Sequence, residues 1–160
     1  MKKKVLAAIL ALIILTAFAA CGKNTNGETR IPIPEGFEHS PTQNLDEVYL
    51  CSDGSTITMM KSSQDPTLED VTEESLTQAL SNAYEKELGA TVTPIEFSDN
   101  DIAGCPGYLF IYQIELDGQI FYQYQFSAQN EYLYTWTLSD ITGTHAEEFA
   151  HCLDNVYLEK

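Results

Sequence analysis

Cysteine, histidine and carboxylate side chains are the residues of this 160-residue chain whose types and spacing could do chemistry. His145, Glu148 and Cys152 follow one another at intervals of three and four residues, so a helix would bring them to one face. Imidazole, carboxylate and thiolate groups all bind metal ions. No fourth ligand is spaced to join them, so we predict no metal site.

Motifs of the common catalytic and cofactor sites are missing from the sequence. It contains no Gly-x-Ser-x-Gly, no phosphate-binding loop and no His-Glu-x-x-His. None of the three histidines accompanies a recognisable nucleophile motif. We therefore predict no catalytic residue and no cofactor.

Three further thiols belong to the body of the chain, at Cys51, Cys105 and Cys152. Outside the cytoplasm two of them could oxidise and leave one over, and the pairs 51–105, 51–152 and 105–152 all stay open. A fully reduced set is the other alternative. Cys152 comes three residues after Phe149 on an expected helix, which favours a buried free thiol there.

Cys21 is the cysteine with the clearest chemistry. A basic start at residues 1–4 and fourteen uncharged residues at 5–18 lead to Ala19-Ala20-Cys21. This resembles a secretory signal that ends in a bacterial lipobox, where the thiol receives a diacylglyceryl group and the signal is cut just before it. Phe18 stands where leucine is usual, and an ordinary signal peptide with an incidental cysteine is the alternative.

The lipobox divides the chain into three parts. We predict a signal peptide at 1–20, a lipidated Cys21 with a flexible polar tether at 21–30, and one folded domain at 31–160. Fourteen apolar residues are too few to span a bilayer comfortably, whereas two acyl chains on one residue give stable anchoring. The expected location is the extracytoplasmic face of the bacterial cell membrane, with the membrane itself as a partner through Cys21.

Negative charge dominates the part after the signal. Residues 21–160 keep five basic and 24 acidic residues, a formal net charge of −19. Such a surface repels nucleic acid and anionic lipid head groups, so we predict no nucleic-acid partner. It suits a protein or envelope component with a basic surface, although solubility alone would also explain it.

Three alternating runs at 108–114, 120–126 and 132–138 predict a three-stranded antiparallel meander. Apolar and aromatic residues occupy the even positions throughout. A two-residue turn at Asp117-Gly118 would mix the two faces, so we predict a three-residue turn that pairs Ile114 with Ile120. The same logic pairs Tyr112 with Tyr122, Phe126 with Tyr132 and Tyr122 with Trp136.

This register would gather nine of the 17 aromatic residues on one face of the sheet. We interpret that face as a core layer, because it must be covered for the chain to fold. An exposed aromatic platform for a ligand is the alternative. Either way, the remaining elements must cover the meander.

Those elements follow from local signals. A proline-rich edge segment opens the domain at 31–38, a hairpin turns at Asp53-Gly54, and a helix ends at Gly89. Val48, Leu50, Ile57 and Met59 are the expected inward residues of the hairpin. A strand at 91–97 carries Pro94, and a closing helix at 144–158 begins with a capping box formed by Thr144 and Glu147. The predicted class is α+β: a single antiparallel sheet of about six strands, flanked by two main helices.

Several of these features together resemble the PsbP-like superfamily. They are the Pro34-Glu-Gly-Phe37 opening, the early hairpin, the central helix, the Gly104-Cys-Pro-Gly107 turn before a tyrosine-rich meander, and the closing helix. The resemblance covers about residues 31–158. It implies a central antiparallel sheet with helices on both faces, and proteins that bind or assemble other proteins without a shared catalytic site.

The function expected from the sequence is therefore a lipid-anchored extracytoplasmic binding or assembly module rather than an enzyme. The alternative is a cell-envelope enzyme of another kind that acts on peptidoglycan or lipid. A deep pocket with clustered carboxylates of shifted pKa would favour the enzyme, and a filled core with a flat surface would favour the binding module.

Cys21→Ala tests the anchor. Because the thiol is both the acylation site and the processing signal, the variant should accumulate as an uncleaved precursor or be released from the membrane. Fractionation and mass spectrometry of the chain's N-terminus check this. Mature protein that stays on the membrane after the substitution would contradict the lipoprotein prediction.

Overall fold

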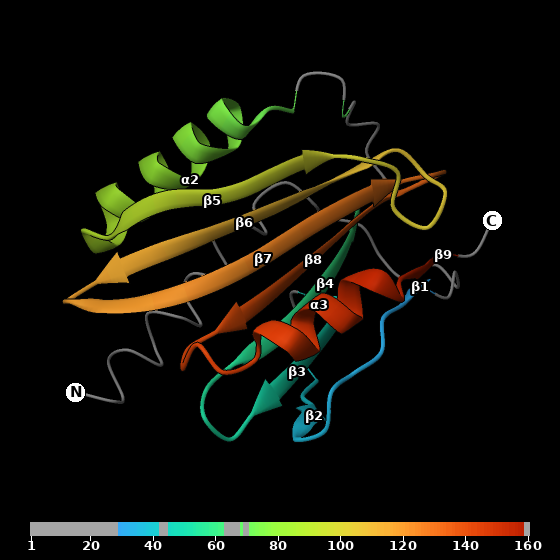
Figure 1. Cartoon of the computed structure of the whole chain (residues 1–160), viewed down its shortest axis with the longest axis horizontal. Coiled ribbons are helices and arrows are strands. Elements are labelled where there is room, and N and C mark those ends of the chain that lie inside the picture. Colours follow the sequence, from blue (N-terminus) through green and yellow to red (C-terminus); the bar gives the residue numbers. More distant parts are fainter. Residues whose placement is uncertain (1–28, 42–44, 63–67, 69–70, 159–160) are drawn as a thin grey trace.

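Seven antiparallel strands form one open sheet in this computed structural model, which describes residues 29–41, 45–62, 68 and 71–158. The strand order is β2-β3-β4-β8-β7-β6-β5. The strands are β2 (Phe37–His39), β3 (Glu47–Cys51), β4 (Thr56–Ser62), β5 (Thr91–Asp99), β6 (Gly107–Leu116), β7 (Gln119–Gln129) and β8 (Leu133–Asp140). The described chain also holds two helices, α2 (Glu73–Leu88) and α3 (Ala146–Asp154) (Figure 1). The α+β class is confirmed, with seven sheet strands where about six were expected.

A small second sheet pairs the start of the described chain with its end. β1 (Thr29–Arg30) lies antiparallel to β9 (Tyr157–Leu158). The segment predicted as a flexible tether, 21–30, therefore includes a two-residue strand at its end. The predicted signal peptide at 1–20, Cys21 and the tether at 22–28 lie outside the described residues. Within those residues, neither helix is long and apolar enough to cross a bilayer.

Helix α2 begins and ends at capping groups. Thr72 accepts a hydrogen bond from the amide of Ser75, whose side chain accepts one from the amide of Thr72. Gly89 ends the helix in the left-handed conformation, with φ of 70°, and its amide donates to the carbonyl of Glu85. The predicted stop at Gly89 is confirmed.

Both edges of the sheet show why the proline-bearing segments cannot be central strands. β5 is one edge strand, and its register shifts between Pro94 and Glu96. β2, which follows the Pro32 and Pro34 segment, is the other edge. The β3–β4 hairpin is also confirmed, but Leu50 is 39% exposed and is not an inward residue.

The predicted register of the meander is wrong. β6 and β7 are joined by the two-residue turn Asp117-Gly118, which pairs Ile114 with Phe121 and Gln113 with Tyr122. Both turn residues have positive φ, 53° and 75°, the requirement of a type I′ hairpin turn. At the next turn, Phe126 pairs with Trp136 and Tyr122 with Asp140.

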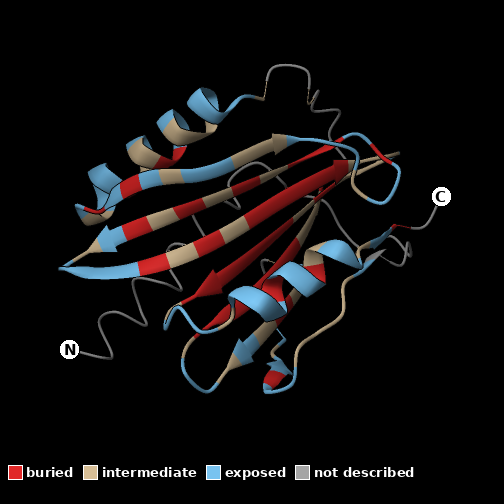
Figure 2. Ribbon diagram, viewed as in Figure 1, coloured by how far each residue is buried: buried red, intermediate tan, exposed pale blue. Residues whose placement is uncertain are grey.

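The correct register divides the aromatic residues between two cores on opposite faces. Even-numbered residues of β6 pack with α2, in a cluster of Leu80, Tyr84, Val92, Tyr108, Phe110, Tyr112, Ile114 and Phe121. Even-numbered residues of β7 and β8 pack with α3, in a cluster of Phe37, Ile57, Met59, Phe126, Tyr134, Trp136, Leu138, Phe149 and Cys152. Figure 2 shows the buried strands between helices whose outer faces are exposed. The interpretation as core is confirmed, but for two layers rather than one.

Trp136→Ala tests the core around α3. The Trp136 ring is 2% exposed and stacks on Phe126 with 4.7 Å between ring centroids. Its removal should lower the free energy of unfolding by roughly 3–5 kcal/mol. Urea denaturation measures the change, and Ile120→Ala, at a residue that is 46% exposed, is the control expected to cost well under ~1 kcal/mol. A loss as small as the control's would contradict the core assignment.

Candidate functional site

A cluster of thiol, imidazole and carboxylate groups joins the β3–β4 turn to the start of α3. His145 Nε2 lies 2.9 Å from Asp53 Oδ2, and His145 Nδ1 lies 2.5 Å from Glu148 Oε2. The Cys51 sulfur, an Asp53 carboxylate oxygen and a His145 ring nitrogen all lie within 4.8 Å of one another. We call Cys51, Asp53, His145 and Glu148 the Cys51 cluster.

The hairpin turn positions the first half of this cluster. Cys51 ends β3, and its amide donates to the carbonyl of Ser55 at 2.9 Å. The Asp53 carboxylate accepts hydrogen bonds from the Ser55 amide at 2.8 Å and the Thr142 hydroxyl at 3.1 Å. The carboxylate is therefore fixed from both the hairpin and the loop that precedes α3.

Asp140, at the end of β8, positions the second half. Its side chain is fully buried and accepts hydrogen bonds from the four consecutive amides of Thr142, Gly143, Thr144 and His145, at 3.1, 2.7, 3.3 and 2.9 Å. The predicted capping box of Thr144 and Glu147 is wrong. Helix α3 begins at Ala146, and its N-cap residue, His145, makes no side-chain hydrogen bond to the backbone of the first turn. The expected helix over 144–158 also ends early, at Asp154.

Aromatic rings hold the imidazole of His145 in place. The Phe37 ring meets it edge-on at 5.2 Å between centroids, and the Phe149 ring stacks on it at 5.6 Å. Its side chain is 13% exposed, whereas that of Glu148 is 47% exposed. The imidazole therefore has one orientation, with a carboxylate at each nitrogen.

Hydrogen bonds outweigh burial in setting the charges of the cluster. Burial alone would lower the pKa of His145, but its bonds to Glu148 and Asp53 raise that pKa above the usual value. Burial alone would raise the pKa of Asp53, but the Ser55 amide and His145 hold it well below its usual range. Asp53 and His145 thus favour their charged forms, a carboxylate next to an imidazolium.

The three residues grouped by the sequence do not form one site. His145 and Glu148 meet, but the Cys152 thiol donates instead to the carbonyl of Pro32, at 3.0 Å. Burial raises the pKa of the Cys152 thiol to about 11. All three described cysteines are free thiols: Cys105 and Cys152 are buried, and Cys51 is half-buried.

Cys51 and Asp53 are the members that sequence reasoning missed. The sequence predicts Asp53-Gly54 as a hairpin turn and Cys51 as one candidate for a disulfide, and it assigns neither residue to a site. The available signal was a thiol and a carboxylate two residues apart at a tight turn. Asp53 and His145 are 92 positions apart, so no local spacing could join them.

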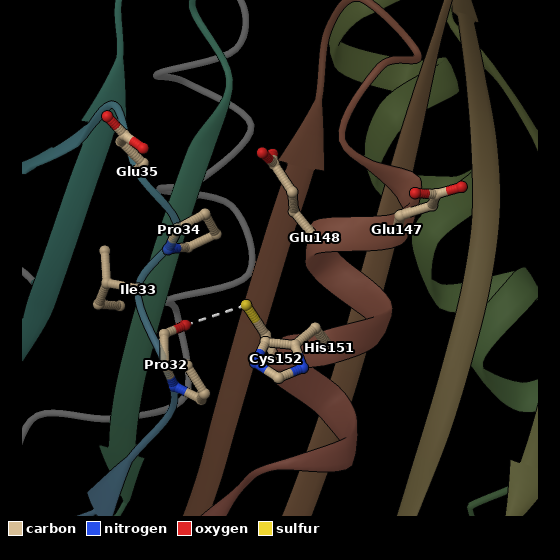
Figure 3. A pocket seen from close by; sticks show the side chains of 8 residues that line it. All are labelled: Pro32, Ile33, Pro34, Glu35, Glu147, Glu148, His151 and Cys152. Atoms are coloured by element: carbon tan, nitrogen blue, oxygen red, sulfur yellow. Dashed lines mark hydrogen bonds between the residues drawn. The ribbon is translucent and has the colours of Figure 1, made fainter.

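A shallow groove of about 420 Å³ lies beside the Cys51 cluster, between residues 32–35 and α3 (Figure 3). Its walls are Pro32, Ile33 and Pro34 on one side and His151 and Cys152 on the other, with carboxylates at Glu35, Glu147 and Glu148. We call it the acid-edged groove. It offers an apolar wall with negative charge along its margin.

Comparison with solved structures identifies the fold. The chain is similar to cyanobacterial PsbP (CyanoP) from Synechocystis, with a TM-score of 0.64 and 15% identity over 88% of this chain and 98% of that one. The chain has a PsbP-like fold. It is also similar to LpqN, involved in cell envelope biogenesis of Mycobacterium tuberculosis, with a TM-score of 0.51 and 10% identity over 89% of each chain.

These likenesses confirm the fold that the sequence resemblance implied, a central antiparallel sheet with helices on both faces. No protein-family model matches the chain, and a search of curated proteins also finds no match. At identities of 15% and 10% the solved structures carry over no functional residue. The Cys51 cluster must therefore be judged on its own geometry.

Asp140→Asn tests what positions the cluster. The asparagine side chain has the same size, but an NH₂ group replaces one of the two acceptor oxygens. This NH₂ group would face backbone N–H groups that donate to Asp140 in the unmodified protein. Since hydrogen bonds to a charged group are worth about 1.5–3 kcal/mol each, we expect a loss of roughly 3 kcal/mol in the free energy of unfolding. Asp154→Asn, at an exposed residue of α3, is the matched control and should change stability by less than ~0.5 kcal/mol. Equal values for the two variants would show that Asp140 does not organise this loop.

Proposed function

We propose that this chain is a lipid-anchored extracytoplasmic module that binds or assembles other cell-envelope components, and that it is not an enzyme. The observation that carries the proposal is the acid-edged groove beside α3 on a PsbP-like fold. The lipobox-like segment at Cys21 supports the anchor and the location. LpqN, which shares the fold and is involved in envelope biogenesis, is consistent with that setting.

The chemistry of the groove favours a basic protein segment as its occupant. Pro32, Ile33 and Pro34 form a preformed apolar wall, since proline fixes the backbone before binding. Glu35 and Glu147 are exposed on opposite sides of the groove and could each meet a lysine or arginine of a partner. An extended segment with an apolar centre and basic ends would match both features.

The overall charge supports the same class of partner. The formal net charge of −19 over residues 21–160 would attract a basic surface over long distance and speed the encounter. The anchor would hold the domain close to the membrane, where an envelope partner is found. Affinity would come from the apolar contact and depend less on salt.

The geometry gives little support to an envelope enzyme. A Cys51 nucleophile would need His145 to take the thiol proton, but both ring nitrogens of His145 are already held by carboxylates, Nε2 by Asp53 and Nδ1 by Glu148. The groove is open and shallow rather than a deep pocket with convergent polar groups. Turnover of a peptidoglycan or lipid substrate, abolished by Cys51→Ser, would contradict the proposed function.

Charge reversal in the groove tests the proposed function. Crosslinking on intact membranes first identifies the partner, and association and dissociation rates are then measured with the purified partner. Glu35→Lys together with Glu147→Lys should slow association about tenfold or more at low salt. Raising the salt to about 0.1 M, where screening acts over about 10 Å, should reduce the difference.

The matched control carries the same change of net charge far from the groove. Glu96→Lys with Glu115→Lys places the new charges on exposed residues of β5 and β6, at the opposite edge of the sheet. This pair should slow association much less. If the two double variants associate at the same rate, the groove is not the binding site. If the association rate of the unmodified protein does not change with salt concentration, long-range charge attraction does not speed the encounter.

A further inference from the structure

We propose that Cys51, Asp53 and His145 bind one divalent transition-metal ion, and that Zn²⁺ fits this donor set best. The three donors come from the β3–β4 turn and the residue before α3, and their ligand atoms lie within 4.8 Å of one another. These three ligands do not line the acid-edged groove, although Glu148, which contacts His145, does. The bound ion would tie the hairpin to the helix.

The distances are close to those that a metal ion requires. Zinc bonds of about 2.0–2.3 Å in a tetrahedral arrangement separate their donor atoms by about 3.4 Å. Asp53 Oδ2 and His145 Nε2 are now 2.9 Å apart, as a hydrogen-bonded pair. The Cys51 sulfur lies within 4.8 Å of a ligand atom of each of these two residues, so closing on the ion would require shifts of about an ångström, and the metal ion would replace the proton shared by Asp53 and His145.

The kinds of donor point to zinc. A thiolate, an imidazole and a carboxylate together suit a borderline ion, whereas calcium and magnesium prefer oxygen ligands alone. Three protein ligands leave one position of a tetrahedral ion open. Water or a side chain of a bound partner would fill it.

The surroundings resemble the outer shell of a metal site. Metal-binding histidines usually donate their other ring N–H to a carboxylate, which leaves the facing nitrogen as the ligand. Glu148 Oε2 stands at this place, 2.5 Å from His145 Nδ1. The Ser55 amide and the Thr142 hydroxyl orient the Asp53 carboxylate, while Phe37 and Phe149 hold the imidazole.

A simple ion pair accounts for only part of this arrangement. It explains why Asp53 and Glu148 flank His145, but it assigns no role to the thiol beside them. Cys51 is half-buried, in contrast to the buried thiols of Cys105 and Cys152. A metal ion would use all three ligands, and binding would release the thiol proton.

Titration with Co²⁺, followed by competition with Zn²⁺, tests the proposal. The full-length protein is extracted in detergent, reduced and stripped of metal. We expect one equivalent of Co²⁺ to give a thiolate-to-cobalt absorption in the near ultraviolet, together with the intense visible bands of a tetrahedral ion. One equivalent of Zn²⁺ should abolish both signals and raise the melting temperature.

Variants assign the ligands. Cys51→Ser should remove the thiolate absorption, and His145→Gln should weaken binding at least about tenfold. Glu148→Gln should keep the absorption but weaken binding by about 10–100-fold, as expected for an outer-shell carboxylate. His151→Gln and Asp154→Asn, at exposed residues of the same helix, are the matched controls and should leave binding unchanged.

Alkylation of the unmodified protein gives a readout that needs no variant. Iodoacetamide should label Cys51 faster than the buried Cys105 and Cys152, and Zn²⁺ should protect Cys51, as mapped by mass spectrometry. Labelling of Cys51 at the same rate with and without Zn²⁺ would overturn the proposal. Cobalt binding that survives both Cys51→Ser and His145→Gln would overturn it as well.

Discussion

The two-residue turn at Asp117 and Gly118 determines which side chains of β7 point to each face of the sheet. Both residues have positive φ, a geometry that an Asp-Gly pair adopts easily and that matches the twist of a hairpin. With a turn of this length, Ile114 lies opposite Phe121. Even-numbered residues of β6 and β7 therefore point to opposite faces of the sheet.

This register places polar side chains of β7 inside the molecule, where tyrosines of β6 form hydrogen bonds with them and Gln125 Oε1 alone of their amide atoms is buried without a partner. Gln123 Oε1 accepts a hydrogen bond from the Tyr112 hydroxyl at 2.6 Å, and Gln125 Nε2 donates to the Tyr108 hydroxyl at 2.8 Å. Buried amides without such partners would destabilise the fold, so these hydrogen bonds from the tyrosines of β6 offset much of the free energy that this register costs. The two faces can then each bury an aromatic cluster under its own helix.

The sequence predicted where the helices and strands lie, but not which face of the sheet the side chains of each strand point to. Both results have one physical reason. Gly89, Pro94 and Asp53-Gly54 act through local backbone geometry, and each produced the expected helix end, edge strand or turn. Alternation shows which residues share a face within a strand, but it does not show which faces are buried when both sides are covered. The candidate site was missed because its halves meet only after β4 and β8 pair.

The candidate site depends on the register of the next pair of strands, β7 with β8. Because Phe126 pairs with Trp136, β8 extends to Asp140 opposite Tyr122, and a buried carboxylate stands where the strand ends. That carboxylate gathers four successive amides and so fixes where His145 lies and where α3 starts. β4 pairs with β8 through Thr56 and Ser139, which brings the turn bearing Asp53 to the same end of the sheet. A slip of one residue in β8 would move His145 away from Asp53 and carry Glu147 away from the Pro32–Pro34 wall, so the cluster and the groove would be lost together.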